Sequence, residues 1–209
     1  MIDLYCERLG PGLWAEPLNE LTNLAFLVAA WVSWQLARRS DTLPGSVVVL
    51  IALMAAVGIG SALFHTFATT WARVLDVVPI LMFQLYFSWL YFRRVISVGS
   101  FYSALAVASL LIAALIARLF PSVLNGSLTY LPALALLVGL GVYHYMEQKQ
   151  ERLALLAASG VFVLALFFRT FDEAACPLTP FGTHFLWHVL NAVVLYLAFW
   201  GLVRNLRTT

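Results

Sequence analysis

Two histidines four residues apart, His184 and His188, open the last apolar run of the chain, "HFLWHVLNAVVLYLAFWGLV". In a helix this spacing places both imidazoles on one face, one turn apart. One metal ion can then take a nitrogen from each ring, and neutral imidazoles suit zinc. The pair alone is a weak indication, because histidines at helical spacing also bond to backbone or water.

Three further polar residues are expected at the same depth in a membrane. His65 lies near the end of the second apolar run, in "GIGSALFHTFATTWARVLDVVP", and Ser61 precedes it by one turn. Asp76 follows near the start of the third run. Ionisable groups inside a membrane helix are costly and usually face the interior of the bundle with a function. The sequence therefore predicts that these residues converge with the histidine pair.

A set of three histidines would leave one position of a tetrahedral zinc site for water, as in catalytic sites. Water on such a metal ionises near pH ~7 rather than near ~16. Asp76 would accept its proton and later deliver it to a leaving group. Ser61 would donate a hydrogen bond to the developing oxyanion.

Simpler interpretations exist for the same residues. Ser61 is small enough to let two helices approach closely, and Asp76 has Arg73 nearby as a partner. A single histidine such as His65 often bonds across helices in a membrane protein. The fourth histidine, His144, stands near the other end of its run without partners in sequence, and we interpret it as structural.

The composition decides what kind of element positions these residues. Of 209 residues 63% are hydrophobic and only 11% are charged, too few for a soluble domain of this size. Seven runs approach the roughly 20 apolar residues that cross a bilayer as a helix. They are about 19–37, 46–67, 74–92, 101–119, 128–146, 153–169 and 183–203. We predict an all-α membrane protein, one seven-transmembrane-helix bundle over residues 1–209. A β-barrel is not expected, since "VVVLIALMAAVGIG" does not alternate.

The charges indicate an orientation. Eight cations follow the odd-numbered runs and four follow the even-numbered runs or precede the first. The eight are Arg38, Arg39, Arg93, Arg94, Lys149, Arg152, Arg204 and Arg207. The positive-inside rule then predicts an integral multi-pass protein with its N-terminus outside and its C-terminus in the cytoplasm, in the inner membrane if the source is bacterial. The net charge of +2 is spread over loops, so membrane lipids and not nucleic acid are the expected partners.

Both cysteines, Cys6 and Cys176, fall on the side predicted to lie outside. An oxidising compartment would allow them to pair. From their spacing alone, a disulfide and two separate buried thiols are equally compatible with the sequence.

Taken together, "GIGSALFHTFATTWARVLDVVP" and "HFLWHVL" resemble the alkaline ceramidases, part of a superfamily of seven-helix membrane hydrolases that includes the adiponectin receptors. The shared pattern is a serine, a histidine four later, an aspartate eleven beyond, and a late HxxxH. Ser61, His65, Asp76, His184 and His188 match it. The resemblance implies three zinc-ligating histidines, with the serine and the aspartate acting on bound water and the substrate carbonyl.

The resemblance extends to the N-terminal "YCE" and "AEPLNELTN" and to the aspartate-to-cysteine spacing of "FDEAACP". It implies that Cys6 and Cys176 are disulfide-bonded. It also makes Glu16, Asn19 and Asp172 candidates for a supporting role around the metal ligands, with plain helix packing as the alternative.

The sequence departs from the family in one place. Eukaryotic alkaline ceramidases are similar to one another in an Asp-Trp-Cys-Glu-x-Asn run that, with a later glutamate, holds calcium. In "LYCERL" Glu7 and Glu16 match, but Leu4 and Leu9 stand where the aspartate and the asparagine would be. Calcium takes about six or more oxygen ligands, so calcium is only a weak prediction here.

We therefore predict a zinc-dependent intramembrane amidohydrolase that cleaves ceramide or a related N-acyl lipid into a fatty acid and a sphingoid-type base. The residues themselves do not distinguish ceramide from another lipid amide. The main alternative is a zinc-containing seven-helix lipid receptor without turnover, and a metal transporter is a third. A retinal protein is excluded, because the only lysine, Lys149, lies between two runs.

Overall fold

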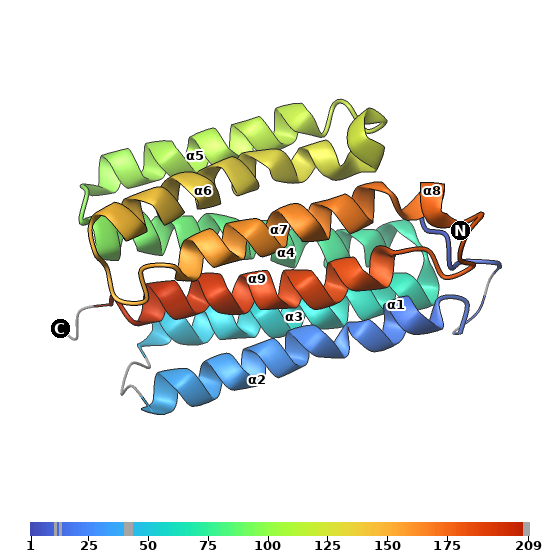
Figure 1. Cartoon of the computed structure of the whole chain (residues 1–209), viewed down its shortest axis with the longest axis horizontal. Coiled ribbons are helices and arrows are strands. Elements are labelled where there is room, and N and C mark those ends of the chain that lie inside the picture. The colour runs from blue at the N-terminus through green and yellow to red at the C-terminus, as the bar shows by residue number, and fades with distance from the viewer. Residues whose placement is uncertain (11, 13, 40–43, 207–209) are drawn as a thin grey trace.

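The structure is a computed structural model, and it describes residues 1–10, 12, 14–39 and 44–206. Over these residues the chain is helical and contains no strand (Figure 1). The first helices are α1 (Pro17–Thr22), α2 (Leu24–Arg39), α3 (Gly45–Phe67), α4 (Thr70–Leu90) with the π-helical turn η1 (Tyr91–Ile96), and α5 (Ser100–Ala117). The others are the 3₁₀ segment η2 (Val123–Tyr130), α6 (Leu131–Met146), α7 (Ala154–Thr170), α8 (Asp172–Ala175) and α9 (His184–Val203).

Each of the seven apolar runs contains one long helix, which confirms the prediction of an all-α membrane protein. By length and composition, five helical segments within the described part of the chain qualify as membrane spans. They are Gly45–Phe67, Thr70–Ile96, Ser100–Ala117, Val123–Met146 and His184–Val203. The helices α2 and α7 are shorter, with 16 and 17 residues. That all seven cross the bilayer stays a prediction. Arg207, counted for the orientation, lies outside the described residues.

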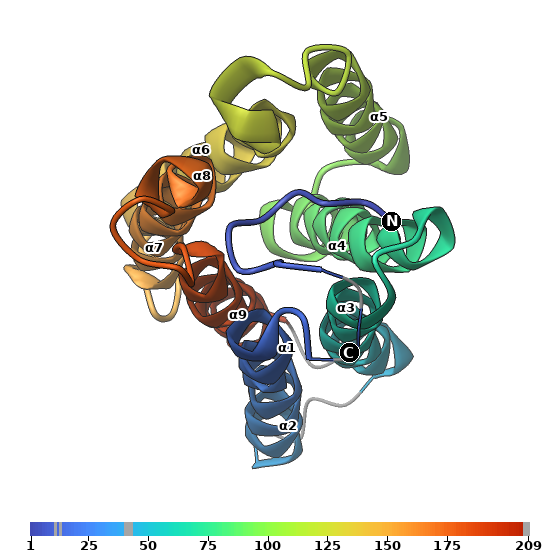
Figure 2. The same cartoon turned by 90° about the vertical axis from the view of Figure 1, so that its right-hand side faces the viewer.

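The long helices are arranged as a ring in sequence order (Figure 2). Each packs against the next along the chain, and α9 closes the ring by packing against both α7 and α2. Much of α9 is buried, whereas the apolar residues of α5 are largely exposed, as expected for a helix that faces lipid. The side chains at the start of α9 therefore point into the bundle.

The end of the bundle that carries the N-terminus, called the N-terminal end below, is crossed by the segment before α1 (Figure 2). A disulfide joins Cys6 in this segment to Cys176 after α8, as the family resemblance implies. The carboxylate of Asp172 accepts hydrogen bonds from the backbone N–H groups of Cys6 (2.9 Å), Thr183 (2.6 Å) and His184 (2.8 Å). One buried carboxylate thus fixes the segment to the start of α9, where the helix dipole favours negative charge.

A close contact between α3 and α4 lies at Gly60. A Cβ atom at this position would clash with the backbone carbonyl of Leu75, so only glycine allows the two helices to approach this closely. Ser61 and Asp76 directly follow the two residues in contact. The approach of the helices therefore brings a serine and an aspartate together that are distant in sequence.

Candidate metal centre

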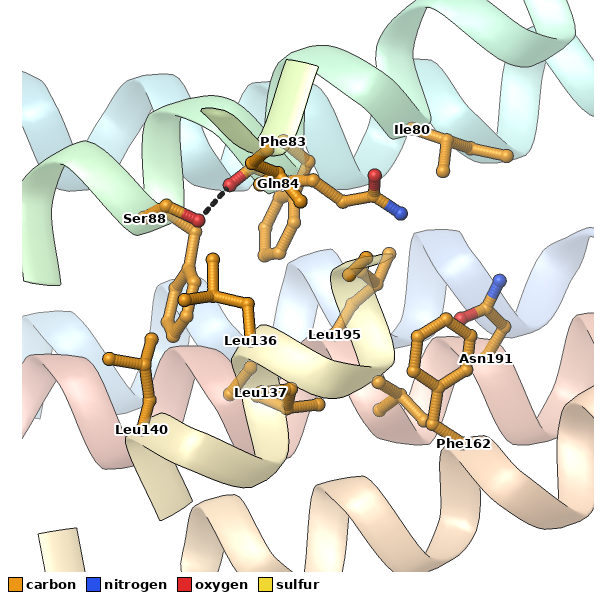
Figure 3. A pocket seen from close by; sticks show the side chains of 15 residues that line it. Ile80, Phe83, Gln84, Ser88, Leu136, Leu137, Leu140, Phe162, Asn191 and Leu195 are labelled. Atoms are coloured by element: carbon orange, nitrogen blue, oxygen red, sulfur yellow. Dashed lines mark hydrogen bonds between the residues drawn. The ribbon is translucent and has the colours of Figure 1, made fainter. Parts of the chain in front are cut away.

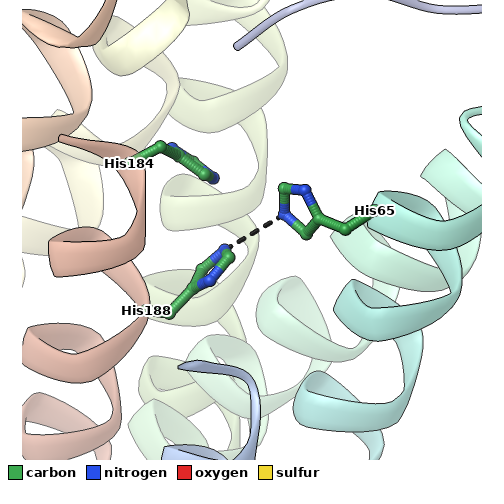
Figure 4. Close-up of side chains that lie close together, drawn as sticks. All are labelled: His65, His184 and His188. Carbon is green, nitrogen blue, oxygen red and sulfur yellow. Dashed lines mark hydrogen bonds between the residues drawn. The ribbon is translucent and has the colours of Figure 1, made fainter. Parts of the chain in front are cut away.

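Three histidines meet inside the N-terminal end of the bundle. His65 comes from the last turn of α3, and His184 and His188 come from the first two turns of α9 (Figure 4). All three are buried, and one ligand nitrogen of each lies within 4.8 Å of the others. The predicted convergence of the three imidazoles is therefore present in the structure.

The hydrogen bonds of two of these rings assign their protons. His65 Nδ1 lies 2.5 Å from the carboxylate of Glu16, which only accepts, so this nitrogen carries the proton. His188 Nδ1 lies 3.0 Å from Thr22 Oγ1, whose own hydroxyl donates to the carbonyl of Leu18 (2.7 Å). His188 Nδ1 therefore donates to Thr22. A neutral ring with its proton on Nδ1 has a free lone pair on Nε2.

The two Nε2 atoms of His65 and His188 face each other at 3.1 Å. Two lone pairs at this distance repel each other unless a cation lies between them. Nitrogens bound to one tetrahedral zinc ion stand roughly 3.3 Å apart, given bonds of about 2.0–2.1 Å. In addition, His184 Nδ1 is buried without a hydrogen-bond partner among the described residues. The three rings thus suit zinc or another metal that accepts neutral imidazoles.

Ser61 and Asp76 lie beside the three histidines. Ser61 is buried one turn before His65 on α3, and its hydroxyl is hydrogen-bonded to the Asp76 carboxyl. His65 also lies near that carboxyl. The structure therefore gathers all five residues that the sequence singles out.

Glu16 connects this cluster to the N-terminal segment. Its carboxylate accepts hydrogen bonds from Nδ1 of His65, from the side-chain amide of Asn19 (2.9 Å) and from the guanidinium of Arg8. The same guanidinium also donates to the backbone carbonyl of His65. Burial opposes the ionisation of Glu16, but the bonds from His65 and Asn19 and the charge of Arg8 outweigh it and lower its pKa. An ionised carboxylate is therefore held against the outer nitrogen of His65.

Glu7 caps helix α1, and the hydrogen bonds that its carboxylate forms with described residues go to this helix and not to the histidines. Its carboxylate accepts the backbone N–H groups of Leu18 (2.7 Å) and Asn19 (2.8 Å), which caps the start of α1. Burial raises the pKa of Glu7, against the effect of these two hydrogen bonds. Because protein donors already occupy the carboxylates of Glu7 and Glu16, these contacts do not favour the calcium prediction.

Three contacts of the site were not predicted from the sequence. The ring of Tyr5 stacks on His184 with centroids 3.6 Å apart, and burial raises the pKa of its phenol, so it stays neutral. Arg8 forms an ion pair with Glu16, and the hydroxyl of Thr22 accepts a hydrogen bond from Nδ1 of His188. Tyr5 belongs to the "YCE" run of the resemblance, which is the only signal that pointed toward it.

The fourth histidine is separate from this site. His144 is buried between the hydroxyl of Tyr91 (2.6 Å) and the carbonyl of Gln150 (2.9 Å), toward the other end of the bundle. Both of its nitrogens have a protein partner. This agrees with the structural interpretation of His144.

A protein-family model described as "Ceramidase" matches residues 10–207. The chain belongs to the ceramidase family. The match spans α1 to α9 and includes all three histidines, Ser61 and Asp76, so it agrees with the resemblance seen in the sequence motifs. Membership in the ceramidase family supports a membrane enzyme that hydrolyses the amide bond of a ceramide-type lipid. No curated protein matches the chain.

Proposed function

We propose that this ceramidase-family protein is a zinc-dependent intramembrane amidohydrolase, which releases a fatty acid and a sphingoid-type base from ceramide or a related N-acyl lipid. The observation that carries the proposal is the approach of the Nε2 atoms of His65 and His188 to 3.1 Å, while the Nδ1 atom of each ring is bonded to another partner. The third ring, His184, and the bonded pair of Ser61 and Asp76 lie next to them.

When bound by these rings, zinc polarises a carbonyl group and lowers the pKa of a water molecule that it holds to about 7. Asp76 accepts the proton of the attacking water as the new C–O bond forms. It then gives this proton to the amide nitrogen as the C–N bond breaks, so that the amine leaves neutral. Once Asp76 is protonated it can donate to Ser61, which leaves the serine hydroxyl free to donate a hydrogen bond to the carbonyl oxygen, on which negative charge develops.

Glu16 and Thr22 keep the ligand nitrogens directed into the site. Each accepts the Nδ1 proton of one ring, Glu16 from His65 and Thr22 from His188. Such partners fix the tautomer and the orientation of a ligating imidazole, and they raise its basicity. A carboxylate does this more strongly than a hydroxyl, so His65 is expected to be the stronger ligand of the two.

A second feature that supports a lipid substrate is an apolar cavity deeper in the bundle (Figure 3). Ile80, one turn beyond Asp76 on α4, and Asn191, one turn beyond His188 on α9, line it. Phe83, Phe162 and Leu195 contribute apolar walls. An acyl chain held there would place its amide at the histidines. The cavity measures about 50 Å³, smaller than such a chain, so the lining side chains must move apart on binding.

The proposal includes the arrangement in the membrane. Seven helices would cross the bilayer as one domain, with the N-terminal end and the histidines on the outer side and the C-terminus in the cytoplasm. The excess of cations at the C-terminal end supports this orientation. The lipid would then enter from the bilayer between helices, while its polar head stays near the outer water.

The deciding experiment is a metal analysis of purified protein combined with a ceramide hydrolysis assay, for wild type and His188→Ala. We expect about one zinc per chain in the wild type, and the loss of both zinc and fatty-acid release in the variant. Zinc without hydrolysis of ceramide or any other N-acyl lipid would favour the receptor alternative. A carefully prepared wild type without zinc would refute the proposal.

A further inference from the structure

A polar cavity opens at the N-terminal end of the bundle, beside the metal centre. Its volume is about 190 Å³, enough for a small head group with a few water molecules. The charged residues and tyrosines that line it are Tyr5, Arg73, Asp76, Arg118, Tyr130 and Arg169. These residues come from the N-terminal segment, α4, the end of α5, η2 and α7, so the whole end of the bundle builds the cavity.

Positive charge dominates this lining. Arg73, Arg118 and Arg169 face one carboxylate, that of Asp76, which gives the cavity a net charge of +2. Among the described residues, none of the three arginines forms an ion pair within 4.0 Å. The fourth arginine at this end, Arg8, is paired with Glu16. Every arginine that the structure describes at this end without an ion pair therefore lines one cavity.

The guanidinium of Arg169 is held in a fixed orientation by several neighbouring groups. Its Nη1 donates to the carbonyl of Asn125 and to the hydroxyl of Ser127, both at 2.9 Å. The guanidinium also lies over the rings of Tyr130 (5.3 Å to the centroid) and Trp187 (5.7 Å). All of these partners are neutral, so the guanidinium is oriented but its charge is not cancelled. Partly buried charge without a counter-ion is unfavourable unless a ligand supplies one.

The cavity shares two walls with the metal centre. Tyr5 lines the cavity with one part of its surface and stacks on His184 with its ring. Asp76 lines the cavity and is bonded to Ser61. Along α4, Arg73, Asp76 and Ile80 follow one another at helical spacing, which places the arginines, the proposed acid–base group and the apolar cavity in one row.

We propose that this cavity binds the anionic head group of the lipid substrate, a phosphate or sulfate monoester or a sulfonate carried by the base part of the N-acyl lipid. The inference deepens the proposed function and rests on it. Guanidinium groups recognise such tetrahedral oxyanions through paired, charge-assisted hydrogen bonds. A neutral hydroxymethyl head would leave the net charge of +2 in the cavity without a counter-ion. The head in the cavity, the amide at the histidines and the acyl chain below them would occupy the row along α4.

Binding can be measured without turnover. The full-length protein in a neutral detergent is titrated calorimetrically with dodecyl phosphate, with dodecyl glucoside as the neutral counterpart and with inorganic phosphate as the free anion. We expect dodecyl phosphate to bind at least about tenfold more tightly than either, and Arg118→Gln to weaken it about tenfold, the effect of one charge-assisted bond. Arg94→Gln, at the opposite end, is the matched control. The inference would be overturned if inorganic phosphate bound as tightly as dodecyl phosphate, or if the binding of dodecyl phosphate did not depend on Arg118.

Turnover measurements then show whether the cavity binds the head group of the substrate or that of a bilayer phospholipid. Ceramide and ceramide 1-phosphate with the same acyl chain are compared by kcat/KM. We expect the phosphorylated lipid to be preferred at least about tenfold, and Arg118→Gln or Arg73→Gln to lower this ratio by about the same factor. Both arginines are exposed, so these variants should fold even if Arg169→Gln does not.

The outcomes distinguish the two proposals. Faster hydrolysis of neutral ceramide, without arginine-dependent binding of dodecyl phosphate, would refute the anionic head group and leave the amidohydrolase intact. Arginine-dependent binding of dodecyl phosphate with no hydrolysis of any lipid would refute the amidohydrolase and support an anion-binding cavity. A preference for ceramide 1-phosphate that disappears in Arg118→Gln would support both.

Discussion

The Nδ1 atom of His65 lies 2.5 Å from Glu16 Oε2, although 49 residues separate the two in sequence. Glu16 stands just before α1, in a segment that no apolar run includes. A candidate metal ligand on a membrane helix is thus oriented by a carboxylate that reaches it from outside the helices. The first two predictions follow from this relationship.

Glu16→Gln is expected to weaken zinc binding by about 10- to 100-fold, the usual effect of removing the partner of a metal-bound imidazole. The amide can still accept the proton of His65, but it lacks the charge that raises the basicity of the ring. A chelator competition with the purified protein measures this affinity. Glu147→Gln, exposed at the other end of the bundle, serves as the control. Equal zinc affinity of both variants would contradict the role of Glu16.

Arg8→Met is expected to lower the free energy of unfolding by about 3–5 kcal/mol, because it leaves the buried carboxylate of Glu16 without its cation. Both side chains of the pair are almost fully buried, with exposures of 2%. Arg8→Met combined with Glu16→Gln should recover part of this loss, since no buried charge then remains unpaired. Denaturant unfolding in detergent compares the three variants. Additive effects of the two substitutions would show that the ion pair is not coupled.

Asp76→Asn tests the acid–base group apart from the metal. The asparagine keeps the shape and can still bond to Ser61, but it cannot accept the proton of water. We expect kcat to fall by about 10²- to 10⁴-fold with the zinc content unchanged. Metal analysis and hydrolysis are measured on the same sample. A variant that loses its zinc would instead indicate that Asp76 supports the metal centre.

Gly60→Ala is expected to disrupt the site through the backbone. The added methyl group would clash with the carbonyl of Leu75, so α3 and α4 must separate and move Ser61 away from Asp76. Overpacking of this kind costs about 1–3 kcal/mol or more. Gly139→Ala is the matched control, since a Cβ there meets nothing within 4 Å. The control should be slightly more stable than wild type, by about 0.5–1 kcal/mol. Thermal unfolding and turnover decide between the two positions.

Removal of the disulfide by Cys6→Ser with Cys176→Ser is expected to lower stability by about 2–5 kcal/mol. It should also weaken zinc binding, because Tyr5, Arg8 and Glu16 belong to the segment that the bond holds in place. Reducing agent should shift the wild type toward the unfolding temperature of the variant and leave the variant unchanged. If wild type and variant bind zinc equally, the position of this segment does not depend on the disulfide.

Much of the fold follows from local patterns that the sequence displays directly. The apolar runs predicted the helices, even at Pro79, which lies inside α4 without ending it. The spacing of His184 and His188, and of Ser61 and His65, predicted shared helix faces because these residues lie one turn apart. The number of membrane spans does not follow in the same way, since α2 and α7 are shorter than the other long helices.

The contacts around the histidines depend on the path of a segment with no periodic pattern. Nothing local in "YCERLGPGLWAEP" indicates that Tyr5 stacks on His184 or that Arg8 meets Glu16. Each of these contacts joins residues that only the complete fold brings together. The disulfide is a similar case, because two cysteines 170 residues apart have no spacing rule, and only the family resemblance pointed to the bond.

The bond between Cys6 and Cys176 also sets an order of events during synthesis. Cys176 follows α8, so the ribosome must produce every long helix except α9 before Cys6 can find its partner. His184 and His188 emerge later still, and both belong to the candidate metal centre. A nascent chain therefore carries His65 and Glu16 through most of its insertion without the other two histidines of the candidate centre. The centre is completed only when the last helix joins the bundle, so a chain cut short before α9 lacks the site altogether.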